Sequence, residues 1–170
     1  MRLVTLLSIA ALAGMAATAV QAAPVGPVSE IAIAIGPELQ DKADKYGERE
    51  FAVLSRELRQ SVERSLRRAG ALSPSGGGRL ELVIADAKPN RPTLEQLSDR
   101  PGLSLLSHGI GGAEVEGAYI APDGTTTPLR YSWYEGDIRW SWPSTTWADA
   151  EKAFDKFARR LAAGPVYAQR

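Results

Sequence analysis

A long amphipathic segment between two strand-like segments constrains the fold of this chain more than any other feature. Residues 28–35 alternate isoleucines with small or charged residues, and residues 79–87 carry apolar side chains at every second position, so both are predicted strands. Residues 48–69 carry an apolar stripe at helical spacing, and a helix of that length, about 33 Å, can cross a whole sheet. The stripe consists of Phe51, Leu54, Leu58, Val62 and Leu66. If the two strands are parallel neighbours, their helical crossover is right-handed. We expect residues 37–47 to form a polar connection.

The following part of the chain predicts a β-hairpin. Residues 113–120 alternate like a strand, and the Asp123-Gly124 pair is typical of a hairpin turn. A fourth strand is expected over residues 127–137.

A second amphipathic helix is predicted at the end of the chain. Thr146 and Asp149 have the spacing of a capping box, which would start this helix. Its apolar stripe consists of Trp147, Ala150, Phe154, Phe157, Ala158 and Leu161, and Gly164-Pro165 is a stop signal. The order β-α-β-β-β-α predicts an α+β two-layer sandwich, a four-stranded mixed sheet with two helices on one face.

The span from Lys88 to Gly112 is long for a connection in a compact domain, so we expect it to be functional, packed on itself or partly structured. Thr93 and Gln96 have capping-box spacing, which predicts a helical turn, and residues 100–103 have proline and glycine where a type II turn requires them. The glycine-rich stretch 108–114 differs from a phosphate-binding loop because a strand pattern follows it where a helix is needed. We interpret its glycines as permitting a bulge or a close approach of backbone.

The first residues have the pattern of a secretory signal peptide. Arg2 precedes a mostly apolar stretch that ends at Val20, and small or branched residues precede a cleavage site after Ala22. A transmembrane anchor fits less well, because the stretch is short and rich in alanine. We therefore expect residues 1–22 to be removed by the general secretion pathway and residues 23–170 to form a single domain. The mature protein is expected to be periplasmic or secreted, without a transmembrane segment.

Composition excludes several kinds of chemistry. Twenty basic residues balance twenty acidic residues, so the net charge directs the chain neither to nucleic acid nor to an anionic membrane. Without cysteine and with one histidine, the chain can form no disulfide, no thiol nucleophile and no histidine-cysteine metal cluster. A serine-histidine-acid triad would have to use His108, and no nucleophile elbow is present. We expect no catalytic residues, no metal and no cofactor.

Three tryptophans lie within the stretch "YEGDIRWSWPSTTWADA". Trp147 is in register with the last helix and is expected to be buried against the sheet. Trp140 and Trp142 lie in a segment that we expect to be extended, so they share one face. They form a stacking platform if that face is open, or a hydrophobic clamp over the sheet if it is not. The candidate binding residues are Tyr134, Glu135, Asp137, Arg139, Trp140 and Trp142.

Two pairs of carboxylates are the only candidates for acid-base chemistry. Glu135 with Asp137, and Glu114 with Glu116, are spaced so that each pair shares one face of a predicted strand. Such a pair suits a glycan hydrolase, or it belongs to a solvated polar strand face.

The stretches "DAKPNRPT", "DRPGLS", "GIGGAEVEGAYIAPDGTTTPLRYSWYEGDI" and "TWADAEKAFDKFARRLA", together with the signal peptide, resemble a known group. The group comprises exported proteins and lipoproteins of proteobacteria that are classed as domains of unknown function. The resemblance spans nearly the whole mature chain and implies a Gram-negative envelope setting and a non-enzymatic role. It supplies no catalytic residue, and this chain lacks the anchoring cysteine of the lipoprotein members.

Two functions are therefore expected. The first is a periplasmic binding or assembly module, an accessory of an envelope protein, which uses the open sheet face or the long loop. The second is a binder of glycan or peptidoglycan, or a weak acid-pair glycan hydrolase, which uses the aromatic cluster. The sequence does not define an oligomeric state.

Overall fold

The structure is a computed structural model that describes residues 26–141 and 145–164. The expected signal peptide, residues 1–22, and Trp142 lie outside the described residues. The elements are β1 (Val28–Ile35), α1 (Pro37–Gln40), α2 (Ala43–Tyr46), α3 (Glu48–Arg68), β2 (Gly78–Lys88), α4 (Leu94–Asp99), β3 (Gly112–Ile120), β4 (Thr126–Tyr134) and α5 (Ala148–Ala163).

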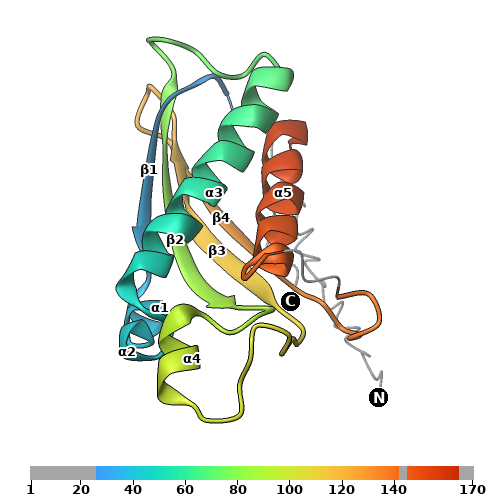
Figure 1. The fold of residues 1–170 in the computed structure, drawn as a ribbon. Helices are drawn as coiled ribbons and strands as arrows, with labels where there is room; N and C mark the ends of the chain where they lie inside the picture. The colour runs from blue at the N-terminus through green and yellow to red at the C-terminus, as the bar shows by residue number, and fades with distance from the viewer. Residues whose placement is uncertain (1–25, 142–144, 165–170) are drawn as a thin grey trace, which may run out of the picture.

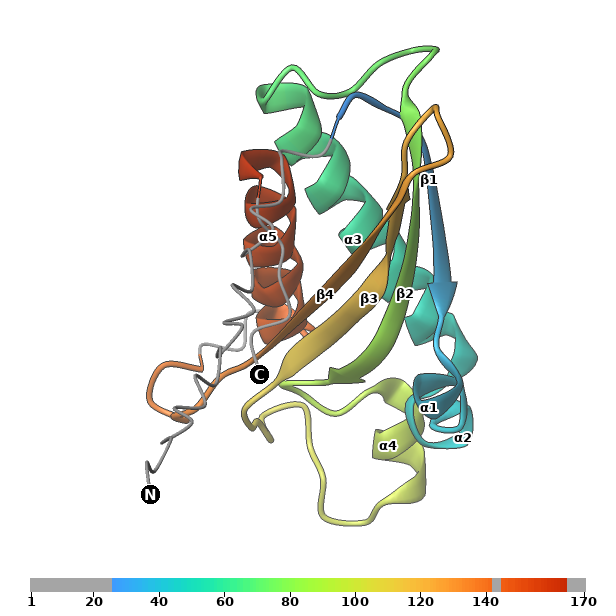
Figure 2. The same ribbon diagram turned by 180° about the vertical axis from the view of Figure 1, so that it is seen from behind.

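The four strands form one mixed sheet in the order β1-β2-β3-β4. β1 pairs with β2 in parallel, whereas β2 with β3 and β3 with β4 pair antiparallel. Both long helices, α3 and α5, lie on the same side of this sheet, and no described helix covers the middle of its other face (Figures 1 and 2). The predicted two-layer α+β sandwich is thus confirmed.

The core lies between the sheet and the two long helices. Leu80, Leu82 and Ile84 of β2 point into it and are almost completely buried, as their alternation predicts. The predicted α3 stripe is also buried, and α5 contributes the fully buried Phe154 and Phe157. This core is the main source of stability, because the chain has no cysteine with which to form a disulfide.

The helices α3 and α5 run in the same direction. Near their starts, the indole Nε1 of Trp147 donates a 2.6 Å hydrogen bond to Glu50 Oε2. Further along, Ser61 Oγ donates a 2.7 Å hydrogen bond to Asp155 Oδ1. Trp147 itself is 2 % exposed and meets the ring of Tyr46 edge to face, so its predicted burial is confirmed.

The open face of the sheet carries charged side chains that pair with one another. Arg130 bridges Glu114 and Glu116, which share this face as predicted. Asp86 follows an irregularity in the register of β2 and accepts hydrogen bonds from Lys42 Nζ at 2.5 Å and from Tyr134 Oη at 2.7 Å. Asp86 thereby links the turn between α1 and α2 to the sheet.

Several predicted boundaries are wrong. The expected polar connection, residues 37–47, folds into the short helices α1 and α2. Strand β4 ends at Tyr134 rather than near Asp137, so neither Glu135 nor Asp137 lies on a strand. The expected capping box of Thr146 and Asp149 is absent: α5 has Trp147 at its N-cap, without a side-chain cap.

Candidate functional site

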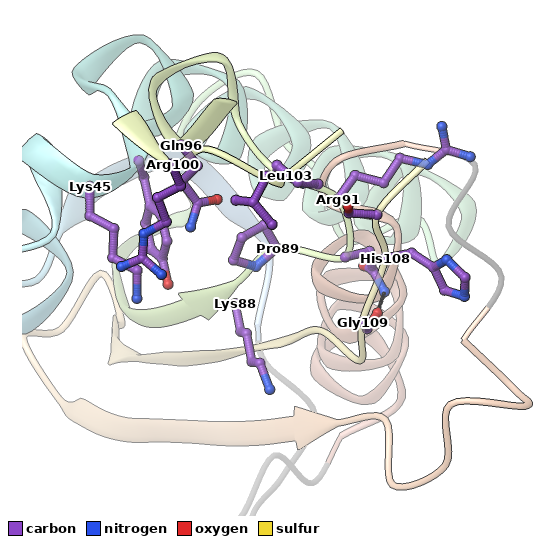
Figure 3. Close-up of a pocket in the computed structure, with 13 residues that line it drawn as sticks. Lys45, Lys88, Pro89, Arg91, Gln96, Arg100, Leu103, His108 and Gly109 are labelled. Carbon is purple, nitrogen blue, oxygen red and sulfur yellow. Dashed lines mark hydrogen bonds between the residues drawn. The ribbon is translucent and has the colours of Figure 1, made fainter. Parts of the chain in front are cut away.

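A cavity of about 260 Å³ lies at the end of the sheet where β2 leaves it (Figure 3). Its walls come from α2, from α4 and from the segment between β2 and β3. The lining residues are Lys45, Tyr46, Lys88, Pro89, Asn90, Arg91, Pro92, Gln96, Arg100, Leu103, Ser107, His108 and Gly109. The volume is slightly below the range of about 300–1,000 Å³ that is usual for small-molecule sites, so it suits one compact chemical group.

The lining carries positive charge without an acid to balance it. Lysine and arginine side chains are protonated at neutral pH, and the described residues that line the cavity include no Asp or Glu. Within residues 26–141 and 145–164, Lys45, Lys88 and Arg100 form no ion pair with a carboxylate. Figure 3 shows Lys45 and Arg100 at one side of the view and Arg91 and His108 at the other. Such a lining favours an anionic group.

Local sequence signals shape the cavity wall. The predicted capping box of Thr93 and Gln96 is confirmed, with both reciprocal hydrogen bonds at 3.2 Å, and it starts α4. The predicted turn at residues 100–103 is also confirmed: the N–H of Leu103 donates to the carbonyl of Arg100, and Gly102 has φ of 95°. These features place Gln96 and Arg100 at the cavity.

A buried polar network joins this wall to the start of α5. The amide nitrogen of Asn90 donates to Gly109 O at 3.1 Å, to Ser141 Oγ at 2.8 Å and to Asp149 Oδ2 at 2.5 Å. Its amide oxygen accepts the backbone N–H of Asp149 at 2.8 Å. Asn90, Ser141 and Asp149 are each at most 5 % exposed. The network therefore connects three segments that are distant in sequence.

Gly111 and Asp149 are in direct contact within this network. The N–H of Gly111 donates to Asp149 Oδ2 at 3.0 Å, and a Cβ at position 111 would lie 2.6 Å from Lys88 O. The predicted close approach of backbone in the glycine-rich stretch is thereby confirmed at this residue. Burial alone would raise the pKa of the Asp149 carboxyl, but hydrogen bonds from Lys152, Asn90 and other donors hold that pKa below its usual value.

Tyr134 and Trp140 of the predicted aromatic cluster lie in different surroundings. Tyr134 bonds to Asp86 on the open face of the sheet, and burial with this hydrogen bond raises the pKa of its phenol. Trp140 lies in a turn rather than in an extended segment, with its N–H bonded to Asp137 O. The Trp140 side chain is 73 % exposed, so it does not act as a clamp over the sheet. Trp142 lies outside the described residues.

The charged members of that cluster pair locally. Asp137 and Arg139 form an exposed ion pair, and the Arg139 guanidinium and N–H hold the pKa of Asp137 below its usual value. Glu135 accepts a hydrogen bond from the N–H of Gly136. Because β4 has already ended, Glu135 and Asp137 are not placed across a strand face as an acid pair would need.

The other candidate catalytic residues are Glu114, Glu116 and His108, and they lie in different parts of the structure. Glu114 and Glu116 share the salt bridge to Arg130 at a second cavity of about 200 Å³ on the open face. Nδ1 of His108 lies 3.3 Å from the carbonyl oxygen of Leu106. In the described part of the chain, no three His, Cys, Asp or Glu side chains gather as a metal site. No helix of that part is both long and apolar enough to cross a membrane.

Sequence reasoning missed the cavity, although it had singled out the segment that forms most of it. Arg91, Arg100 and His108 belong to the long span between β2 and β3, and Lys88 is the last residue of β2. Lys45 belongs to α2, which was expected to be an irregular connection. The lysine and arginine residues of this span were the available signal.

Comparisons with known proteins assign no family. No protein-family model matches the chain, and no curated protein matches it. Among solved structures, rare lipoprotein B from Shewanella oneidensis is 15 % identical, with a TM-score of 0.36 over 79 % of this chain and 91 % of that chain. A minor lipoprotein from Acinetobacter baumannii is 12 % identical, with a TM-score of 0.32 over 82 % of this chain and 98 % of that chain. At these values the likeness carries no assignment of function.

Proposed function

We propose that this protein is an exported, non-enzymatic binding or assembly module of the Gram-negative envelope, and that its ligand carries an anionic group held in the cavity. The observation that supports this most directly is the lining: Lys45, Lys88 and Arg100 lie at one small cavity without a carboxylate partner. Gathering cations in this way is unfavourable unless an anion offsets their repulsion. The envelope setting is supported by the predicted signal peptide and by the resemblance of the sequence to exported proteobacterial proteins.

The proposed role is binding rather than catalysis. Hydrolysis by a nucleophile requires a hydroxyl or thiol beside a general base. Ser107 and His108 both line the cavity, but Ser107 Oγ accepts the N–H of Ser104 and the His108 ring contacts the carbonyl of Leu106. Acid-base chemistry by a carboxylate would need an acid in the lining, where the described residues have none.

The ligand site is tested by titrating the protein with inorganic phosphate in about 0.1 M salt and following amide chemical shifts. We expect the largest shifts for residues around the cavity, and we expect binding to weaken as salt is added. The double variant Lys88→Gln with Arg100→Gln should lose at least roughly tenfold in affinity, since two of the charges are removed.

The matched control is the double variant Arg67→Gln with Arg68→Gln. These exposed arginines end α3, roughly 30 Å from its start beside the cavity, given the rise of an α-helix. The control should bind phosphate within about twofold of the wild type, because the Debye length is only about 10 Å at 0.1 M salt. Equal affinity of the wild type and the cavity variant would refute the proposed site. Release of the protein by osmotic shock tests the exported location.

A second candidate function is glycan binding, which the 73 % exposure of Trp140 favours. An exposed indole offers a flat apolar face on which a sugar ring can stack. Retention of the wild type on insoluble peptidoglycan, with loss of retention after Trp140→Ala, would support this function over the first.

A further inference from the structure

The exposed large hydrophobic side chains of the described residues are concentrated in two connections. One connection is the span between β2 and β3, and the other joins β4 to α5. The five side chains, with their exposed fractions, are Leu94 (77 %), Leu105 (66 %), Leu106 (84 %), Ile138 (48 %) and Trp140 (73 %). Single exposed hydrophobics are ordinary on protein surfaces, but their concentration at one end of a molecule indicates an interaction site.

Both connections lie at the same end of the molecule (Figures 1 and 2). They are also joined directly: Ser141 Oγ donates to Gly109 O at 3.0 Å, and the N–H of Asn90 donates to Thr146 O at 2.7 Å. The loops at the opposite end, residues 69–77 and 121–125, consist mainly of glycine, proline and polar residues. The apolar tips therefore belong to one end, which is also the end that carries the cavity.

The same end combines three features that suit the interface of a lipid bilayer. Leucines at loop tips can enter the boundary between headgroups and acyl chains, and a tryptophan is favourable at that depth. The cavity places Lys45, Lys88 and Arg100 at the same end of the molecule, where they can bind the phosphate of an anionic lipid.

Selectivity for anionic lipid would come from the cavity rather than from the whole surface. The chain has no net charge, the Asp137–Arg139 pair is neutral, and α4 carries Glu95 and Asp99 near the leucines. We therefore expect apolar contacts to provide most of the affinity and headgroup recognition to provide the preference.

We propose that this end of the molecule binds the surface of an anionic lipid bilayer, with Leu105, Leu106 and Trp140 in the interface and a headgroup phosphate in the cavity. The inference rests on the proposed function, because it uses the same cavity for an anionic group. It goes further by naming the lipid surface as the source of that group.

The test compares vesicles of phosphatidylcholine with vesicles that also contain phosphatidylglycerol, in a flotation assay with the full mature protein. We expect the wild type to bind the anionic vesicles more tightly. The double variant Leu105→Gln with Leu106→Gln should weaken vesicle binding by roughly tenfold or more, because two apolar side chains lose their burial. It should keep its affinity for inorganic phosphate within about twofold, since neither leucine lines the cavity.

Trp140 supplies an independent measurement. Lipids brominated in the acyl chain quench tryptophans that enter the interface, and Trp147 is buried in the core. The chain also has Trp133 and Trp142, so both proteins that are compared carry Trp133→Phe and Trp142→Phe. Quenching of the protein that keeps Trp140, if it decreases strongly after Trp140→Phe, would place this side chain in the bilayer. Equal quenching in both proteins would overturn that placement.

The remaining outcomes separate this proposal from the function on which it rests. Phosphate binding without vesicle binding overturns the membrane proposal and leaves the anion site intact. Vesicle binding that Lys88→Gln with Arg100→Gln does not change overturns the headgroup role of the cavity. Retention on peptidoglycan without vesicle binding overturns the proposal in favour of a glycan partner.

Discussion

Replacing Asn90 by alanine tests whether α5 holds the loop that forms the cavity. The Asn90 side chain donates to Gly109, Ser141 and Asp149, and it accepts the N–H of Asp149 at the start of α5. Asn90 is only 2 % exposed, so water cannot readily replace these hydrogen bonds.

The expected cost follows from the groups that alanine leaves behind. A buried N–H without its acceptor, here that of Asp149, costs about 1–3 kcal/mol, and a lost hydrogen bond to a carboxylate costs about 1.5–3 kcal/mol. The Asp149 carboxylate still has Ser141, Gly111 and Lys152 as donors. We therefore expect Asn90→Ala to lower the free energy of unfolding by about 3–5 kcal/mol, or Tm by roughly 6–20 °C.

Urea unfolding followed by tryptophan fluorescence measures this cost, and amide hydrogen exchange at Asp149 measures the local effect. Thr145→Ala is the matched control, because it removes an exposed hydrogen bond to Glu151 in the same connection. This control should stay within ~0.5 kcal/mol of the wild type. If Asn90→Ala unfolds at the same urea concentration as the control, the network does not hold the loop and the reasoning is refuted.

Three further predictions concern stability. Trp147→Ala should cost ~3–5 kcal/mol, whereas Trp140→Ala should stay within ~0.5 kcal/mol because its side chain is exposed; equal thermal unfolding shifts would contradict the assigned burial. Leu54→Ala should lower the free energy of unfolding by ~2–5 kcal/mol, whereas Arg56→Ala, at an exposed position, should change it by no more than ~0.5 kcal/mol. Chemical denaturation measures both, and similar values would show that the buried face of the helix is wrongly assigned. Burial opposes ionisation of the Asp86 carboxyl, but its hydrogen-bond partners lower the pKa of this carboxyl overall. The ionised Asp86 therefore stabilises the fold above about pH 4, and this stabilisation is lost as the pH falls through the folded-state pKa. Asp86→Asn should therefore lose less stability than the wild type on acidification below pH 4 in urea titrations, and an unchanged pH dependence would count against this role.

The fold could be predicted from the sequence because its main elements have strong periodic patterns. The α3 stripe and the alternation in β2 each specify a single buried face, and both faces are buried as predicted. Boundaries without periodicity were harder to predict. Trp147 is buried by its contacts with Tyr46 and Glu50, and Asp149 bonds to Asn90, so tertiary contacts replace the expected capping box.

The site could be predicted only in part. Capping-box spacing and the proline-glycine turn are local signals, and both are present in the cavity wall. The meeting of Lys45 with Lys88 and Arg100 is not local, because it depends on how α2 and the long loop fold against the sheet end. The predicted shared face of Glu135 and Asp137 failed for a similar reason. A two-residue spacing places side chains on one face only within a strand, and β4 ends at Tyr134.

The position of α5 after all four strands in the chain has a consequence for how the protein acquires its structure. Phe154, Phe157 and Leu161 cover the inner side of β3 and β4, so the hairpin can form early but has no apolar cover until α5 arrives. In a chain that is still being synthesised, or in one truncated before residue 148, Val115 and Tyr131 are exposed to other molecules. The core can therefore be completed only after α5 has been synthesised, and chains that lack α5 are expected to aggregate rather than to fold partially.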